Sequence, residues 1–104
     1  MSMYRASEGI ENEEWLGELE TVADRLDLDA EARSAARELF LSSVPEQERS
    51  KRSALAASVY AGSLVAGDRR SQTAVADAAD VSRLSIQKRW KDLLAGAGLE
   101  PPTW

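Results

Sequence analysis

The sequence predicts an all-α domain, a single bundle of five helices whose last two form a helix-turn-helix. Three observations support this prediction. Apolar side chains recur three and four residues apart in several segments, which is the spacing of one helix face. Residues 53–66 are apolar or small on every face, as expected of a helix in the middle of a bundle. No segment shows the alternation of apolar and polar residues that is typical of a half-buried strand.

The first half of the chain predicts a tail and two amphipathic helices. Residues 1–10 show no periodicity and are expected to form a flexible N-terminal tail. A first helix is predicted over residues 12–26, with glutamates on its outer face. Asp29 is a good N-cap for a second helix, because its carboxylate can accept hydrogen bonds from free backbone amides. Pro45 ends that helix. Its predicted core positions are Ala32, Ala35, Ala36, Leu39 and Phe40.

The second half predicts the central helix, followed by the helix-turn-helix over about residues 71–95. Gly67 can adopt the left-handed conformation that closes the central helix. Ser71 and Ser82 can cap the fourth and fifth helices, with residues 80–82 as the turn between them. The stripe of the fifth helix that should face the central helix consists of Ile86, Trp90 and Leu93.

Glycine and proline residues set the expected end of the domain. Gly96 and Gly98 interrupt the fifth helix, and two prolines at 101–102 prevent its continuation. The helical domain is therefore expected over residues 11–97, followed by a C-terminal tail over residues 98–104. Trp104 in this tail is expected to fold back onto the bundle, and the alternative is a short partner-binding hook.

Composition excludes several classes of function. The 104 residues contain no cysteine and no histidine, which removes disulfides, cysteine-bound zinc and histidine-dependent catalysis. We therefore expect no cofactor and no bound metal, and an enzyme is the least favoured class. The chain lacks the features of a signal peptide and the roughly 20-residue apolar run of a membrane span. We expect a cytoplasmic, nucleoid-associated protein that does not contact a membrane.

The net charge of −5 conceals an uneven distribution along the chain. Residues 1–48 contain 13 acidic and four basic residues, whereas residues 49–104 contain nine basic and five acidic ones. A basic C-terminal half is what a surface that meets phosphate requires. The alternative is a solvated surface on which the charges fell unevenly.

Polar and basic side chains surround the predicted turn and the fifth helix. A recognition helix presents the N-terminal half of its outer face to base edges, while flanking cations meet phosphates. This pattern predicts a DNA-binding surface. Its candidate residues are Arg69, Arg70, Ser82, Arg83, Leu84, Ser85, Gln87, Lys88 and Lys91. The same helix pair also occurs in bundles that never touch DNA.

The run RSALAASVYAGSLVAGDRRSQTAVADAADVSRLSIQKRWKDLL resembles the second cyclin-type repeat of archaeal and eukaryotic transcription factor B. In that family an alanine-rich central helix ends in Tyr-x-x-x-Leu, here Tyr60 and Leu64. A Gln-x-x-Val-Ala helix follows, here QTAVA, and then a Val-Ser/Thr-x-Val-Thr-Ile-Arg run, here VSRLSIQ. The upstream ADRLDLDAEARSAARELF resembles the first two helices of the repeat, so the similarity covers about residues 15–95.

The resemblance implies a five-helix, cyclin-like fold and promoter binding through the last helix-turn-helix. In the family, an apolar residue and an arginine one turn apart do much of the reading, beside the TATA-binding protein. Leu84 and Gln87 occupy those positions here. Leu84 can still contact a thymine methyl group. Gln87 suits adenine and cannot make the bidentate guanine contact of arginine, so the base preference should differ from the family's.

The expected function is that of a stand-alone transcriptional regulator that binds promoter-like duplex DNA. One repeat without cysteine lacks the zinc ribbon and the second repeat of the family protein, so we expect weak binding that a homodimer would strengthen. The alternative is a protein-interaction module of the transcription machinery, in which the acidic first half docks on a basic partner. The TATA-binding protein and polymerase subunits are the partners expected in that case.

Overall fold

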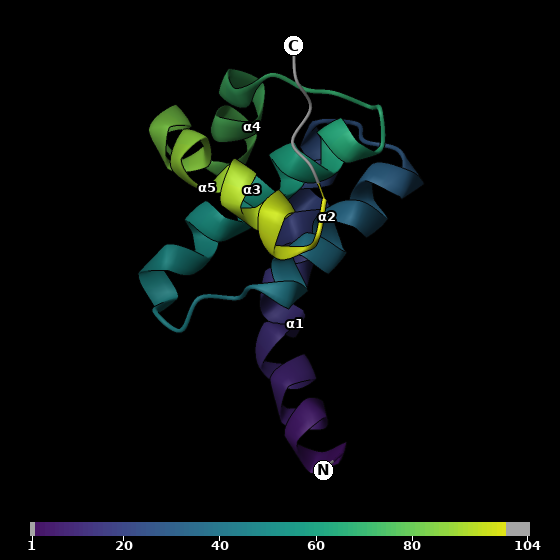
Figure 1. Cartoon of the computed structure of the whole chain (residues 1–104), viewed down its shortest axis with the longest axis vertical. Coiled ribbons are helices and arrows are strands. Elements are labelled where there is room, and N and C mark those ends of the chain that lie inside the picture. Colours follow the sequence, from purple (N-terminus) through teal and green to yellow (C-terminus); the bar gives the residue numbers. More distant parts are fainter. Residues whose placement is uncertain (1, 100–104) are drawn as a thin grey trace.

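The computed structural model describes residues 2–99 and places five helices and no strand in that range (Figure 1). The helices are α1 (Ser2–Arg25), α2 (Ala30–Ser42), α3 (Glu48–Val65), α4 (Gln72–Ala79) and α5 (Arg83–Gly96). The predicted all-α fold with five helices is thus confirmed. None of the helices in the described range is long and apolar enough to cross a membrane.

The central helix α3 packs against each of the other four helices. Every residue from Ala54 to Ser63 is buried, as expected of the segment that is apolar or small on all sides. In Figure 1, α2 and α5 lie on either side of α3, and α4 lies beside the first turns of α5. Because α3 contacts every other helix, its position determines where α4 and α5 sit.

The helices α2 and α3 approach each other closely at Gly62. A Cβ atom built on this glycine would lie 2.6 Å from the backbone nitrogen and 2.8 Å from the Cα atom of Ala36. No Cβ atom tolerates such distances to backbone atoms. A glycine on α3 and an alanine on α2 are therefore what allows the two helix backbones to meet here.

Two helices begin earlier than the periodicity predicts. The segment expected to be a flexible tail, residues 1–10, is helical from Ser2 onward, and in Figure 1 these first turns of α1 extend away from the bundle. No proline interrupts this segment, so the helical backbone of α1 can continue through it. Likewise α3 begins at Glu48, so Lys51 and Arg52 lie one turn inside the helix and not at its end.

The predicted core differs from the observed core on two helices, α5 and α2. Leu94 is completely buried on α5, whereas Leu93 is only partly buried. The buried stripe of α5 follows residues four apart, Ile86, Trp90 and Leu94, because helices often pack through the ridges formed by every fourth side chain. On α2, Ala35 is half-buried and not part of the core. The expected packing of Trp104 lies outside the described residues.

Candidate functional site

The helices α4 and α5 are joined by the three-residue turn that the sequence predicts. Asp80 ends α4 in the left-handed conformation, with φ of +59°. The backbone N–H groups of Asp80 and Val81 both donate to the Ala76 carbonyl. Ser82 then caps α5 by accepting a hydrogen bond from the Ser85 N–H. These local contacts fix the angle at which α5 leaves the turn.

A local cap holds the N-terminus of α4, and side chains from distant helices hold its C-terminus. At its N-terminus the Ser71 hydroxyl accepts a hydrogen bond from the Ala74 N–H at 3.0 Å. At its C-terminus Arg25 of α1 donates to the Ala78 carbonyl at 2.7 Å, and Arg52 of α3 donates to the Ala79 carbonyl at 3.2 Å. Cations are favourable at this end of a helix, because the last carbonyls have no partner within the helix. The short helix α4 is thereby tied to α1 and α3.

The inner face of α5 is anchored in the core. Ile86 and Leu94 are fully buried, and Trp90 packs edge-to-face against Tyr60 of α3 with ring centroids 5.3 Å apart. An aromatic pair of this geometry stabilises the contact beyond the burial of its area. The orientation of α5 about its own axis is therefore set, and with it the set of side chains that face outward.

Over residues 84–91 the outer face of α5 presents one apolar and three polar or basic side chains, with exposed Arg83 and Asp92 at its edges. Leu84, Gln87, Lys88 and Lys91 are exposed. At about 100° per residue they lie within roughly 100° of one another around the helix. No ion pair in the described part of the chain involves a residue of α5. This surface therefore keeps its positive charge, whereas Arg33 and Arg37 on α2 are neutralised by acidic residues of α1.

A hollow of about 510 Å³ lies beside this face, at the N-terminus of α4. Arg83 donates to the Gln72 side-chain oxygen at 3.3 Å across it, which places the arginine of α5 next to the first turn of α4. The lining consists of Tyr60, Arg69, Arg70, Ser71, Gln72, Thr73 and Arg83. Arginines, hydroxyl groups and the positive end of a helix are a combination that attracts anions.

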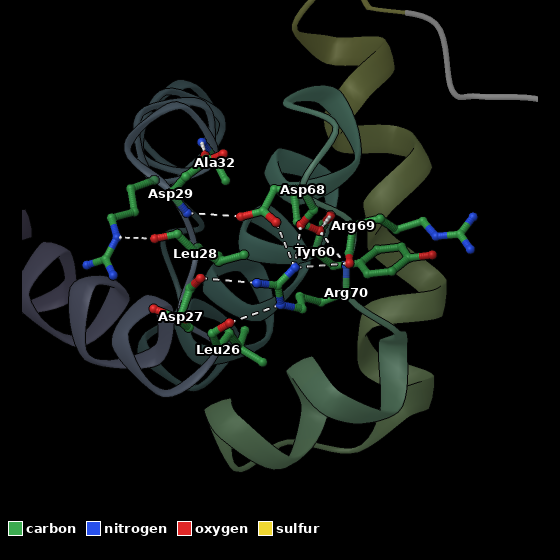
Figure 2. A network of polar contacts seen from close by, with 11 residues as sticks. Leu26, Asp27, Leu28, Asp29, Ala32, Tyr60, Asp68, Arg69 and Arg70 are labelled. Atoms are coloured by element: carbon green, nitrogen blue, oxygen red, sulfur yellow. Dashed lines mark hydrogen bonds and ion pairs between the residues drawn. The ribbon is translucent and has the colours of Figure 1, made fainter.

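Arg70, one of the predicted phosphate contacts, is occupied within the protein (Figure 2). Its Nε donates to the Leu26 carbonyl at 2.9 Å, and its terminal nitrogens donate to the Asp27 carbonyl at 3.1 Å and to the Asp68 carboxylate at 2.8 Å. The guanidinium thus joins the α1–α2 corner to the α3–α4 connection. Arg69 extends away from this network in Figure 2 and is exposed. The guanidinium of Arg70 is therefore part of a hydrogen-bond network within the protein, whereas the side chain of Arg69 lies at the surface.

Asp68 completes the same network from the other side. Its carboxylate accepts a hydrogen bond from the Asp29 backbone N–H at 2.9 Å, and this bond, followed by the one from Arg70, lowers the pKa of Asp68 below its usual value. On α1, the Arg37 guanidinium, with that of Arg33, likewise lowers the pKa of Glu20. Both carboxylates are therefore held in their charged form in the folded protein.

These lowered pKa values predict acid sensitivity below about pH 4. A carboxyl group whose pKa is lower in the folded state stabilises the fold above its unfolded pKa, and this contribution disappears as the pH falls through the folded pKa. The chain has no histidine. Thermal unfolding should therefore change little between pH 5 and 8, and the melting temperature should fall below about pH 4. A D68N variant should lose part of this pH dependence, and a melting temperature that drops already between pH 7 and 5 would contradict the assignment.

The remaining predicted site residues lie around the turn. The Ser82 and Ser85 hydroxyls are 3.0 Å apart and satisfy each other, so their first role is to start α5. Sequence reasoning missed Gln72 as the partner of Arg83, although the QTAVA motif contains it. It also missed Arg25 and Arg52 as caps of α4, and no local pattern signals those contacts. Among residues 12–99, no group of acidic side chains has the arrangement of a metal site.

A comparison with known families decides the relationship. The family model of the transcription factor TFIIB repeat matches residues 16–95. This chain belongs to the TFIIB repeat family. The match includes α2 to α4 entirely and all but the end of α5, so the helix pair around the turn is part of the TFIIB repeat. A search of curated proteins finds no match.

Membership of the TFIIB repeat family indicates the fold of this chain and its general role. The TFIIB repeat is a cyclin-like helical fold, in agreement with the five helices observed. It is a domain of transcription factors and not of an enzyme family, and it works with DNA and the transcription machinery. A role in transcription therefore follows for this TFIIB repeat.

Proposed function

We propose that this protein is a DNA-binding transcriptional regulator that inserts α5 into the major groove of duplex DNA. The single observation that supports this proposal most is the outer face of α5. It is exposed and basic, it makes no ion pair with any described residue, and it belongs to a helix whose inner face is locked in the core. A rigid helix with an open polar and basic face is what major-groove reading requires.

The geometry suggests how the predicted residues divide between bases and phosphates. Leu84 and Gln87, in the first two turns of α5, are placed to meet base edges. Arg83 and Arg69 line the hollow at the N-terminus of α4, where a DNA phosphate would meet arginines and backbone amides. Lys88 and Lys91 extend the basic face along α5. Ser82 and Ser85 support the start of the helix, and Arg70 is assigned to the fold rather than to DNA.

The small number of cations sets a limit on the affinity. The proposed DNA-binding surface has four basic side chains, which neutralise at most about four phosphates. They are Arg69, Arg83, Lys88 and Lys91. A plot of the logarithm of the binding constant against the logarithm of salt concentration should therefore have a slope of about −3.6. The acidic residues of α1 and α2 disfavour indiscriminate binding. Selection of bound duplexes from a random pool, at several salt concentrations, should therefore enrich a motif at low salt and lose it steeply at higher salt.

Matched charge variants sharpen this experiment. K88A/K91A removes two cations from the outer face of α5, and R37A/R49A removes two exposed cations from α2 and the first turn of α3. We expect the first variant to lose about 10- to 30-fold in affinity near physiological salt, with the slope reduced by about 2, and the second to keep most of its affinity. An equal loss in both variants, or no enriched motif, would reject the proposal.

The acidic surface favours a second candidate, a protein-interaction module. Glu13 and Glu14 on α1 are exposed, so a basic partner could reach them. The selection experiment separates the two candidates. An interaction module enriches no duplex, and its weak residual DNA binding is the same in both charge variants.

A further inference from the structure

We infer that the outer face of α5 reads A·T base pairs, with Gln87 recognising adenine and Leu84 recognising a thymine methyl group. This inference rests on the proposed DNA binding and adds the class of sequence that is bound. It depends on the exposure and the spacing of Leu84 and Gln87. It also depends on the positions of the nearby cations, because an arginine on the same face could recognise guanine.

Leu84 is unusual in its exposure. At 56% it is the most exposed of the large hydrophobic side chains in the described range, the other exposed ones being Leu41, Val65 and Leu99 at 41–46%. Val65 and Leu99 share an apolar hollow with Leu39, whereas Leu84 stands in the first turn of α5 among polar and basic neighbours. An isolated apolar side chain on a groove-facing helix can bury its surface against the one apolar group in the major groove, the methyl of thymine.

Gln87 lies one turn further along the same face. It is exposed, and its side-chain amide makes no hydrogen bond within the described residues. A glutamine amide offers one donor and one acceptor side by side, and these match N7 and the N6 amino group of adenine. Guanine presents two acceptors, N7 and O6, which an amide cannot pair with in a bidentate manner. The chemistry of Gln87 thus selects adenine.

The basic residues nearby are not positioned to override this choice. Arg83 is the only arginine in the first turn of α5, and its guanidinium donates to the Gln72 side chain beside the hollow. Lys88 and Lys91 each offer a single ammonium group rather than a planar pair of donors. The Lys91 ammonium also lies over the Trp90 ring, 5.6 Å from its centroid. No bidentate guanine reader therefore shares the face with Leu84 and Gln87.

The spacing of the two side chains predicts the layout of the motif. Side chains three residues apart on a helix have Cβ atoms about 5–6 Å apart, and successive base pairs are separated by about 3.4 Å. Leu84 and Gln87 therefore reach base pairs that are adjacent or separated by one. The expected half-site contains two A·T pairs at that separation, one read through adenine and the other through thymine.

Sequence selection with three proteins tests the inference. The unaltered protein should enrich two A·T positions, a first read by Gln87 and a second read by Leu84. Q87R should change the first position to G·C and leave the second unchanged. L84A should weaken the preference at the second position only. In the enriched duplex, 7-deazaadenine at the first position removes the N7 acceptor and should weaken binding by about 10-fold. Uracil in place of thymine at the second position should weaken binding a few-fold, and L84A should be insensitive to that change.

The outcomes separate this inference from the function on which it rests. Binding without base preference, or a guanine preference in the unaltered protein, would overturn the A·T assignment and leave DNA binding intact. No binding to any duplex would overturn the proposed function itself. Both substituted positions are exposed, and circular dichroism spectra that match those of the unaltered protein will confirm that Q87R and L84A are folded.

Discussion

Replacing Gly62 by alanine is expected to lower the free energy of unfolding by about 3 kcal/mol or more. The added methyl group would lie 2.6 Å from the Ala36 nitrogen, and the neighbouring atoms belong to the backbone of α2. A flexible side chain could move aside, but a helix backbone moves only with the whole helix. The two most extensively packed helices, α2 and α3, would have to separate. For a domain of this size the melting temperature should fall by about 12–24 °C.

Two other glycines provide the control for G62A. Gly17 in α1 and Gly96 in α5 are also helical, but a Cβ atom at either position meets nothing within 4 Å. G17A should stabilise the protein by about 0.5–1 kcal/mol, because alanine loses less conformational freedom than glycine in a helix. If G62A lowers the free energy of unfolding and G17A raises it in the same assay, the loss in G62A is due to the steric clash. A G62A variant as stable as the unaltered protein would show that the helices are not in such close contact.

Replacing Arg70 by alanine is expected to have the second largest effect, about 2–3 kcal/mol of stability. Its guanidinium donates to two carbonyls at the α1–α2 corner and to the Asp68 carboxylate, so its removal leaves three acceptors without their partner. Lysine cannot replace it, because one ammonium group cannot reach acceptors on several sides at once. We therefore expect R70K to recover only a small part of the loss in chemical denaturation.

The control for R70A is an exposed cation on α5. K88A removes the same charge from a residue that makes no ion pair within the described residues, and it should change stability by less than about 0.5 kcal/mol. The double variant R70A/D68N should be less destabilised than the sum of its parts, because both residues belong to one network. If R70A left the stability unchanged while weakening DNA binding as much as K88A, Arg70 would be a phosphate contact after all, as the sequence alone suggests.

Much of the fold follows from patterns that are local in the sequence. Asp29, Ser71 and Ser82 cap their helices as predicted, since a cap needs only a side-chain oxygen and an amide two or three residues later. Gly67 adopts positive φ for an equally local reason. The outer face of α5 was predictable for the same reason, because at about 3.6 residues per turn the inner stripe also defines the outer one.

What the sequence could not show are contacts between residues far apart. The start of α1 was missed because its first turns have no periodic apolar face to signal a helix. The roles of Arg25, Arg52 and Arg70 depend on carbonyl groups 27 to 53 residues away in the chain. Any exposed arginine near a turn resembles a phosphate contact when its neighbours are unknown. The hollow at α4 likewise forms only when the α3–α4 connection lies across the first turn of α5.

The sequence by itself determined the number and order of the helices, the caps of α2, α4 and α5, and the side chains that α5 turns outward, because each depends on residues within one or two turns. Its motifs also pointed to the transcription factor family that the comparison then confirmed. Only the tertiary structure decided which basic residues remain available. Arg70 lies in a network that holds two corners together, whereas Lys88 and Lys91 make no ion pair with the described residues. The physical reason is that a cation binds the nearest acceptors, and folding determines which acceptors are near.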